Sequence, residues 1–325
     1  MSRYRADRLT PEAVQSTWEN QRSTTYPGWL YSGGRLRLLG MGGSLNAALA
    51  AAPRMRRDGI PVTAELASDH YRGDLADIGA AETLVLISTS GESIELVELA
   101  ERLRTAGFPR TIALVGSADT PLAALCSHTI ELGIIDEQPI DSFVATVAAL
   151  RRLGAAFGGR PLPDLSRDLE AIDRAILAGR AFAWGSPAPL ADLLGRGSLL
   201  GVARQSALLL REISRVPACS WDPNDFRHGP MESIREEQLT VLFADSSSAM
   251  GEVDRRLARD LRSIPQRSLV VGGSEDPDLR VDDANALPGV PQLAAMIPGI
   301  YAWGSRNAVE AGTFRYTRVT ITEDV

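Results

Sequence analysis

The sequence predicts an α/β protein made of two tandem domains, each with a parallel sheet between layers of helices. Three observations support this fold class. Short apolar runs alternate with longer amphipathic segments, which is the pattern of strands connected by helices. Several of the runs are apolar at every position, as in parallel strands that are buried on both faces. The second half of the chain also repeats the first, and 325 residues suit two domains of roughly 150 residues each.

The internal repeat keeps a nearly constant offset. Residues 38–42, Leu-Leu-Gly-Met-Gly, return as Leu-Leu-Gly-Arg-Gly at 193–197, which is 155 positions later. Because a solenoid repeats at a much shorter period, these matches indicate a duplicated domain. The other matches lie 156 positions apart: Pro61 with Pro217, Gly73 with Gly229, 84–87 with 240–243, 111–116 with 267–272, and Pro121 with Pro277.

Five strands are predicted in the first copy. An apolar run that ends at Gly40 gives the first strand, and the continuous apolar run 83–88 gives a strand that is buried on both faces. A parallel, flavodoxin-like sheet follows from the helices that separate these runs. The five predicted strands are 35–40, 61–66, 83–88, 111–116 and 128–133.

Helices are predicted between these strands. Ser44 can cap a helix through residue 58, because its hydroxyl can accept a hydrogen bond from an orphan backbone amide. The segment 93–106 carries a clear apolar stripe and is closed by Gly107. A short helix is predicted from Pro121, and a long one over 140–157.

A Gly- and Pro-containing break at 158–163 separates the copies. The helix predicted at 165–177 then joins them, with Leu165, Leu169, Ile172 and Ile176 on one stripe. We place the first domain at 30–160 and the second at 180–325.

Composition excludes several classes of function. All 34 basic residues are arginine, so chemistry that needs a lysine imine or a Walker A lysine is excluded. The net charge of −7 argues against a nucleic-acid partner. Two cysteines suit a reducing compartment, and no signal core or run of about 20 apolar residues is present. We therefore expect a cytoplasmic protein with no membrane partner.

The serine-rich loop 88–93 is the strongest candidate for a binding site. Ser88, Thr89, Ser90 and Ser93 place four hydroxyls between a buried strand and a helix. Such a loop at the carboxyl end of a parallel strand suits a phosphate group, because the helix N-terminus favours an anion. Gly91 lets the backbone approach the ligand closely. The alternative is an ordinary helix cap made by Ser90 or Ser93 alone.

A second loop should lie beside the first, and its counterpart in the second copy differs. Gly43 and Ser44 also follow a strand end, so we expect them near the serine loop. The matching loop of the second copy reads Ala-Asp-Ser-Ser-Ser at 244–248, and its aspartate would repel phosphate. One phosphate site per chain is therefore expected, in the first copy.

These motifs resemble the sugar isomerase (SIS) domain family. The similarity is to the double-SIS architecture of the isomerase half of glucosamine-6-phosphate synthase and of fructosamine-phosphate deglycases. It covers residues 30–320 and rests on Gly-Gly-Ser at 42–44, Ser-Thr-Ser-Gly-Glu-Ser at 88–93, Gly-Arg-Gly at 195–197, Leu-Arg-Glu-Ile-Ser at 210–214 and Arg-His-Gly-Pro at 227–230. Since fewer than 40 residues precede the first strand, the synthase itself is not expected.

The resemblance implies a role for each matching position. Gly43, Ser44 and the four hydroxyl residues of 88–93 match phosphate-binding positions. Glu212 matches the group that moves a proton between C1 and C2 of an open-chain sugar, and His228 matches the residue that assists ring opening. A homodimer with its site near the subunit interface is also implied, with a sugar phosphate as the small-molecule partner and no cofactor or metal. The types of the two residues suit enediol chemistry, which needs a carboxylate and a second acid–base group.

The chain also departs from the family pattern. Residues 208–210, before the Arg-Glu pair, are all leucine where the family has a lysine. Near the C-terminus, Thr317 or Arg318 takes the place of another family lysine. Arginine can hold an anion bidentately but does not form imines. We therefore expect an aldose–ketose isomerase, or a related amino-sugar-phosphate isomerase, deaminase or deglycase. The alternative is a non-catalytic protein that binds a sugar phosphate.

Overall fold

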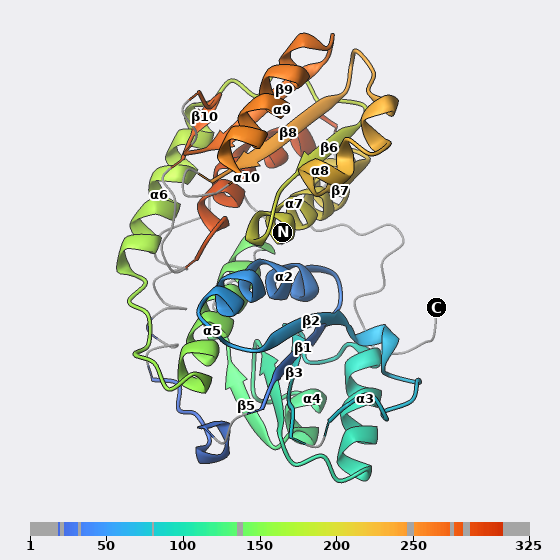
Figure 1. Ribbon diagram of the computed structural model, residues 1–325, viewed down its shortest axis with the longest axis vertical. Coiled ribbons are helices and arrows are strands. Elements are labelled where there is room, and N and C mark those ends of the chain that lie inside the picture. Colours follow the sequence, from blue (N-terminus) through green and yellow to red (C-terminus); the bar gives the residue numbers. More distant parts are fainter. Residues whose placement is uncertain are drawn as a thin grey trace. The chain divides into compact units, whose positions relative to one another are not determined.

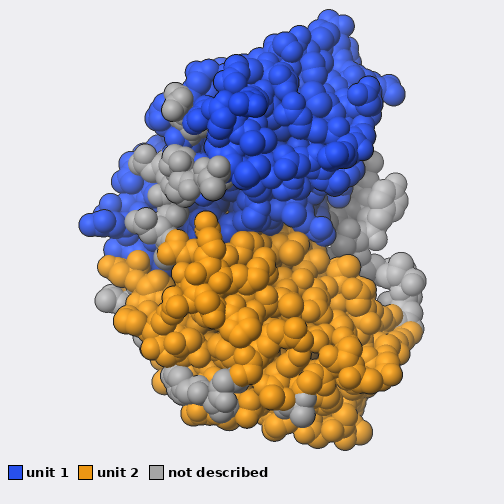
Figure 2. Space-filling model, in the orientation of Figure 1, with its two compact units in different colours: residues 1–11, 165–313 blue, residues 12–164, 314–325 orange. Residues whose placement is uncertain are grey.

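The computed structural model forms two compact α/β units (Figure 1). The structure describes residues 19, 23–31, 34–79, 81–134, 139–245, 250–273, 276–281 and 287–307. The N-terminal unit covers residues 12–164 and the C-terminal unit covers 165–313, coloured orange and blue in Figure 2. Among the described residues, every helix is too short or too polar to cross a membrane.

The N-terminal unit is built on one parallel five-stranded sheet. Its strands lie in the order β2-β1-β3-β4-β5. Helices α2 and α5 pack against each other, as do α3 and α4. The bounds are β1 Leu36–Gly40, α2 Gly42–Arg57, β2 Val62–Leu66, β3 Thr83–Ser88, α3 Ile94–Thr105, β4 Thr111–Val115, α4 Pro121–Leu125, β5 His128–Glu131 and α5 Pro139–Phe157.

The C-terminal unit repeats this topology. Its parallel sheet has the order β7-β6-β8-β9-β10, which is the same arrangement of first to fifth strand. The bounds are α6 Ser166–Ala181, β6 Ala191–Leu194, α7 Ser198–Leu209, β7 Ala218–Trp221, α8 Pro223–Phe226, β8 Leu239–Ala244, α9 Gly251–Ser263, β9 Arg267–Gly272, β10 Leu279–Arg280 and α10 Val290–Arg306. The predicted fold class, with two flavodoxin-like parallel sheets, is confirmed.

Equivalent hydrogen bonds show that the two units are copies. The amide of Leu36 donates to the carbonyl of Pro61 at 2.9 Å, and the amide of Ala191 donates to that of Pro217 at 3.0 Å. Each bond joins the start of the unit's first strand to the proline that precedes its second strand. The strand β3 and its counterpart β8 are buried along their whole length, as expected for strands covered on both faces.

Two predicted helices differ from the observed ones. Ser44 does not cap α2, because the helix begins at Gly42 and the amides of Ser44 and Leu45 both donate to the Met41 carbonyl. The helix predicted at 165–177 continues to Ala181 as α6. Gly179 allows the extended helix to pass close to α10. Any side chain there would clash, because a Cβ would lie 2.1 Å from the Ala295 carbonyl oxygen. Since α6 packs along α10, it belongs with the C-terminal unit. The predicted domain bounds 30–160 and 180–325 stay a prediction.

Each unit buries one charged residue at the same position of its first strand, and the two residues have opposite charges. In β1, the Arg37 guanidinium is 4% exposed and donates to Glu82 at 2.9 Å and to Asp77 at 2.8 Å. Its counterpart in β6 is Asp192, which is 5% exposed and accepts hydrogen bonds from the Trp221 indole and the Gln238 amide. Burial raises the pKa of Asp192, and the two hydrogen bonds oppose that rise.

Replacing Asp192 by Asn should stabilise the C-terminal unit at neutral and alkaline pH. The pKa of Asp192 in the folded protein lies above its value in the unfolded chain, which is about 3.9. The contribution of Asp192 to stability is therefore fully present when the pH is below the unfolded pKa. The contribution is lost as the pH rises through the folded pKa. We expect D192N to raise the free energy of unfolding at pH 8 by about 1 kcal/mol, with the Gln238 side-chain amide turned over so that its buried oxygen accepts from the new NH2 group. Urea denaturation at pH 4 and pH 8 measures this, with the exposed Asp225→Asn as control. A loss of stability at pH 8 in D192N would contradict the assignment.

Candidate functional site

The serine loop lies where the strand order of the N-terminal sheet reverses. The chain passes from β1 to β2 on one side and then crosses to β3 on the other, so β1 and β3 are neighbours. Gly40 pairs with Ile87, and the two strands therefore end side by side. In open α/β sheets this reversal point is where ligands bind, outside the carboxyl ends of the strands. Gly43 and Ser44, in the first turn of α2, follow the end of β1 there, and the serine loop follows the end of β3.

Three serine hydroxyls of the loop form one cluster. The Oγ atom of Ser88 lies 3.3 Å from that of Ser90 and 3.0 Å from that of Ser93. Backbone amides also point at the cluster, because Gly91 donates to Ser88 Oγ and Glu92 to Ser90 Oγ, each at 3.2 Å. Ser88 is 3% exposed, whereas Ser90 and Ser93 are partly exposed. Three of the four predicted hydroxyls, those of Ser88, Ser90 and Ser93, are thus brought together at the end of β3.

The Ser93 hydroxyl does not act as an ordinary helix cap. Ser93 is the N-cap residue of α3, with an extended backbone, yet its side chain makes no capping hydrogen bond. The hydroxyl faces Ser88 instead. The positive end of the α3 dipole is therefore combined with hydroxyls that are turned toward one another, an arrangement suited to an oxyanion.

Gly91 fixes the shape of the loop through a close contact with Thr120. Its backbone has a φ of +65°, and a Cβ would lie 2.4 Å from Thr120 Cβ. The Leu122 amide, in the first turn of α4, donates to the Gly91 carbonyl at 3.1 Å. The Thr89 carbonyl in turn accepts from the Gly116 amide at 2.9 Å. The segment after β4 therefore holds the serine loop in place.

Glu212 lies in a π-helical turn that continues α7. This turn, Leu210–Ser214, is labelled η4 and ends at Arg215, which has a left-handed backbone with a φ of +57°. Burial raises the pKa of the Glu212 carboxyl, and the charge of Arg215 opposes the rise. The Glu212 carboxylate forms no hydrogen bond or close ion pair with any other described residue. A half-buried carboxyl with a raised pKa is suited to giving and taking protons near neutral pH.

Contacts with α10 hold the π-helical turn. The Ser214 hydroxyl donates to the Ile300 carbonyl at 2.6 Å, and the side-chain amide of Asn307 donates to the Ser214 carbonyl at 2.6 Å. At Gly304 a Cβ would lie 2.7 Å from the Ile213 carbonyl oxygen, so the two helices approach closely there. π-helical turns are rare and are frequent at functional sites. No sequence pattern predicted this turn.

His228 lies in an exposed turn between α8 and the short helix η5, Pro230–Ser233. Its amide donates to the Asp225 carbonyl at 2.9 Å. The adjoining Phe226 is fully buried beneath α9 and fixes the turn from below. Glu212 and His228 thus belong to the C-terminal unit, and the serine loop belongs to the N-terminal unit. Thr317 and Arg318 lie outside the described residues.

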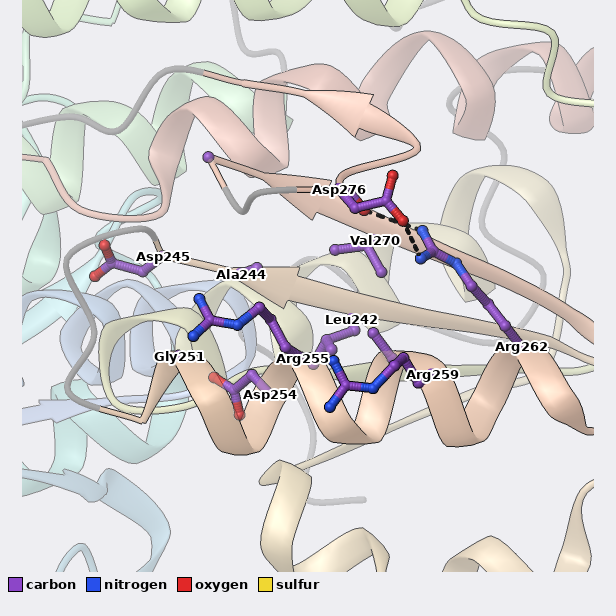
Figure 3. A pocket seen from close by; sticks show the side chains of 12 residues that line it. Leu242, Ala244, Asp245, Gly251, Asp254, Arg255, Arg259, Arg262, Val270 and Asp276 are labelled. Atoms are coloured by element: carbon purple, nitrogen blue, oxygen red, sulfur yellow. Dashed lines mark hydrogen bonds and ion pairs between the residues drawn. The ribbon is translucent and has the colours of Figure 1, made fainter.

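A cavity of about 280 Å³ opens beside α9, and its lining includes neither Glu212 nor His228 (Figure 3). Three arginines of α9, Arg255, Arg259 and Arg262, line it over an apolar floor. In the N-terminal unit α4 follows β4 and packs against α3. No helix is described between β9 and β10, at the matching place in the C-terminal unit. We attribute the cavity to this difference between the copies.

Comparisons with known proteins identify a domain in the N-terminal unit. Residues 30–156 match the SIS domain model. The glutamine–fructose-6-phosphate aminotransferase (isomerizing) of Pyrobaculum aerophilum is 26% identical over 317 residues, which cover 88% of this chain and 50% of that protein. The Mycobacterium leprae protein of the same name is 27% identical over 72% of this chain and 41% of its own length. The chain therefore spans half or less of these relatives.

Solved structures share the fold along nearly the whole chain. Glucosamine-6-phosphate deaminase from Thermotoga maritima superposes with a TM-score of 0.75 and 18% identity, covering 95% of this chain and 99% of that one. Tagatose-6-phosphate ketose/aldose isomerase from Escherichia coli gives 0.75 and 20%, covering 98% and 96%. The domain match at 30–156 identifies a SIS domain in the N-terminal unit, and the second sheet has the same strand order.

Proposed function

We propose that this protein acts on a phosphorylated sugar, as an aldose–ketose isomerase or a related amino-sugar-phosphate isomerase, deaminase or deglycase. The observation that carries the proposal is the cluster of Ser88, Ser90 and Ser93 hydroxyls at the N-terminus of α3, with the Ser93 hydroxyl turned away from capping. Such a cluster can donate several hydrogen bonds to one phosphate group without any lysine.

The phosphate would be held by the two loops that follow β1 and β3. Ser88, Ser90 and Ser93 provide hydroxyls, Thr89 adds a fourth, and Gly43 and Ser44 come from the neighbouring strand end. Arg318 would add a bidentate contact to an anionic group of the substrate. Two curated relatives and two solved structures support this choice of ligand, since each of their names refers to a phosphorylated sugar.

Glu212 would carry the proton between the two reacting carbons. In an enediol mechanism a carboxylate removes the proton from one carbon and returns it to its neighbour. The raised pKa of Glu212 makes it a stronger base when ionised and a ready acid afterwards. His228 would donate and accept the proton that opens the sugar ring. A homodimer would let one subunit's histidine serve its partner's site.

A second candidate is a sugar-phosphate-binding protein without catalysis. The absence of any lysine favours it, because the family places lysines in the catalytic-type helix and the C-terminal segment. A structure described as a putative sugar binding protein from Salmonella typhimurium also shares this fold, with a TM-score of 0.69, 20% identity, and coverage of 88% of this chain and 98% of that one. Proton exchange separates the two candidates.

Incubation with a panel of sugar phosphates in D2O tests the proposal. We expect deuterium to enter C1 or C2 of one of these sugars, as seen by NMR. Glu212→Gln should slow this exchange by about 100-fold or more while ligand binding persists. Ser90→Ala should weaken binding by about 10- to 100-fold, because a hydrogen bond to a charged group is lost. Binding without exchange in the wild type would establish the second candidate, and equal loss of binding in both variants would refute this division of roles.

The role of the Ser93 hydroxyl can be tested by stability alone. Thr120 is the N-cap of α4 and its hydroxyl accepts from the Ala123 amide at 3.4 Å, so Thr120→Ala should cost about 1 kcal/mol. Ser93→Ala should cost less than Thr120→Ala, since no cap is lost and the buried Ser88 hydroxyl keeps its contact with Ser90, yet it should weaken phosphate binding. Denaturant titration and calorimetry measure the two effects. A loss of stability in S93A as large as in T120A would restore the helix-cap interpretation.

The pH dependence of exchange should follow the charge beside Glu212. Arg215 lowers the pKa of Glu212, so Arg215→Asn removes that effect, and Asn tolerates the left-handed backbone. Glu212 then loses its proton only at higher pH, and we expect the acid limb of the exchange rate to move upward. The exposed Arg235→Asn is the matched control. A shift to lower pH in R215N would show that another group controls the acid limb.

A further inference from the structure

A partly buried ion pair joins the first loop of the C-terminal sheet to α9. Arg196 follows Gly195, where β6 has ended, and its Nη2 atom lies 2.8 Å from Asp254 Oδ1. Asp254 is 7% exposed and the Arg196 side chain 20% exposed. Asp254 lies in the N-terminal part of α9 and is one of the buried residues of that helix (Figure 3). The pair therefore lies at the point where the strand order of this sheet reverses.

The N-terminal unit builds the same place from apolar side chains. By the sequence repeat, Met41 occupies the position of Arg196. The buried faces of the two helices place Leu96 of α3 at the position of Asp254. Leu96 is fully buried, and Met41 packs against the same hydrophobic cluster. In register with this pair, Leu99, Ala100 and Leu103 of α3 match Leu257, Ala258 and Leu261 of α9.

This difference between the two units indicates that the fold does not need the ion pair for its stability. Removing two charges from water costs free energy that their attraction only partly repays, and apolar replacements of such pairs are often neutral or stabilising. One copy of this fold already uses apolar residues at these positions. The ion pair of the C-terminal unit is therefore poorly explained by fold stability.

The contacts of Arg196 show what the pair holds. Its guanidinium also reaches Asp222 Oδ1 at 3.5 Å and Asn224 Oδ1 at 3.4 Å. Asp222 caps the single turn α8 by accepting from the Asn224 amide at 2.8 Å. That turn leads directly to His228. Arg227 adds a second connection, since its guanidinium donates to Asp260 on α9.

We propose that Arg196 and Asp254 are positioning residues that fix the α8 turn, and through it the His228 imidazole, against α9. This inference rests on the role of His228 in the proposed function. Phe226 anchors the α8 turn in the core. The Arg196 guanidinium sets the orientation of the polar side of that turn, through Asp222 and Asn224. Replacing the ion pair by the corresponding residues of the N-terminal unit should leave the fold intact and make the α8 turn more mobile.

The test is the double variant Arg196→Met with Asp254→Leu in the full chain. We expect its unfolding midpoint to equal or exceed that of the wild type. Hydrogen exchange at the amides of 224–229 should be about 10-fold faster or more. In the sugar-phosphate exchange assay kcat should fall about 10- to 100-fold with KM within about twofold, because small displacements of an acid–base group are costly. Arg196→Lys keeps the positive charge but not the two-pronged guanidinium. Its amide exchange rate and kcat should therefore lie between those of the wild type and of the double variant.

Arg262→Met is the matched control, because it breaks an ion pair of α9 with Asp276 and leaves the His228 turn untouched. Unchanged kcat and unchanged amide protection in the double variant would overturn the inference, as would an equal effect in R262M. If the wild type exchanges no sugar proton, the proposed function fails. The positioning role of Arg196 and Asp254 is then tested by amide protection alone. Faster exchange confined to 224–229 then supports the positioning role, and unaltered exchange there refutes it.

Discussion

The parallel pairing of β1 with β3 is the constraint on which the candidate anion site depends. Because Gly40 and Ile87 pair in register, the turns after the two strands leave the sheet at adjacent points. A shift of the register would move one turn along the strand direction by about 3.3 Å per residue, which is enough to separate the hydroxyl groups from the neighbouring turn. The buried side chains of both strands fix this register, since both strands are covered on both faces.

Duplication preserved this framework while the polar chemistry diverged. Arg37 and Asp192 occupy equivalent buried strand positions with opposite charge, and each has acquired partners that suit it. At the point where the strand order reverses, one unit presents hydroxyl groups and the other an ion pair. The same backbone can thus hold either arrangement, because the hydrophobic contacts between strands and helices carry the fold. The chemistry of each unit lies in the loops at its strand ends.

Most of the fold could be predicted because its signals are local. The strand β3 spans the run predicted at 83–88, and β9 spans 267–272, the segment that the sequence repeat matches with 111–116. The cap at Ser44 was wrong because a tight glycine turn, rather than a hydroxyl, starts α2. The π-helical turn around Glu212 depends on a hydrogen bond between residues 86 positions apart, and the Arg196 contact joins residues 58 positions apart. Periodicity within a short window carries no information about such contacts.

The mutual hydrogen bonds of the serine hydroxyls have a consequence for how a ligand would enter. Gly91, held against Thr120, keeps the loop backbone in its shape without a ligand. Each hydroxyl already has an oxygen neighbour at 3.0 to 3.3 Å. An incoming oxyanion then exchanges one set of oxygen neighbours for another by rotating O–H bonds, with little loss of backbone entropy. A loop of this kind works as a preorganised solvation shell for a tetrahedral anion.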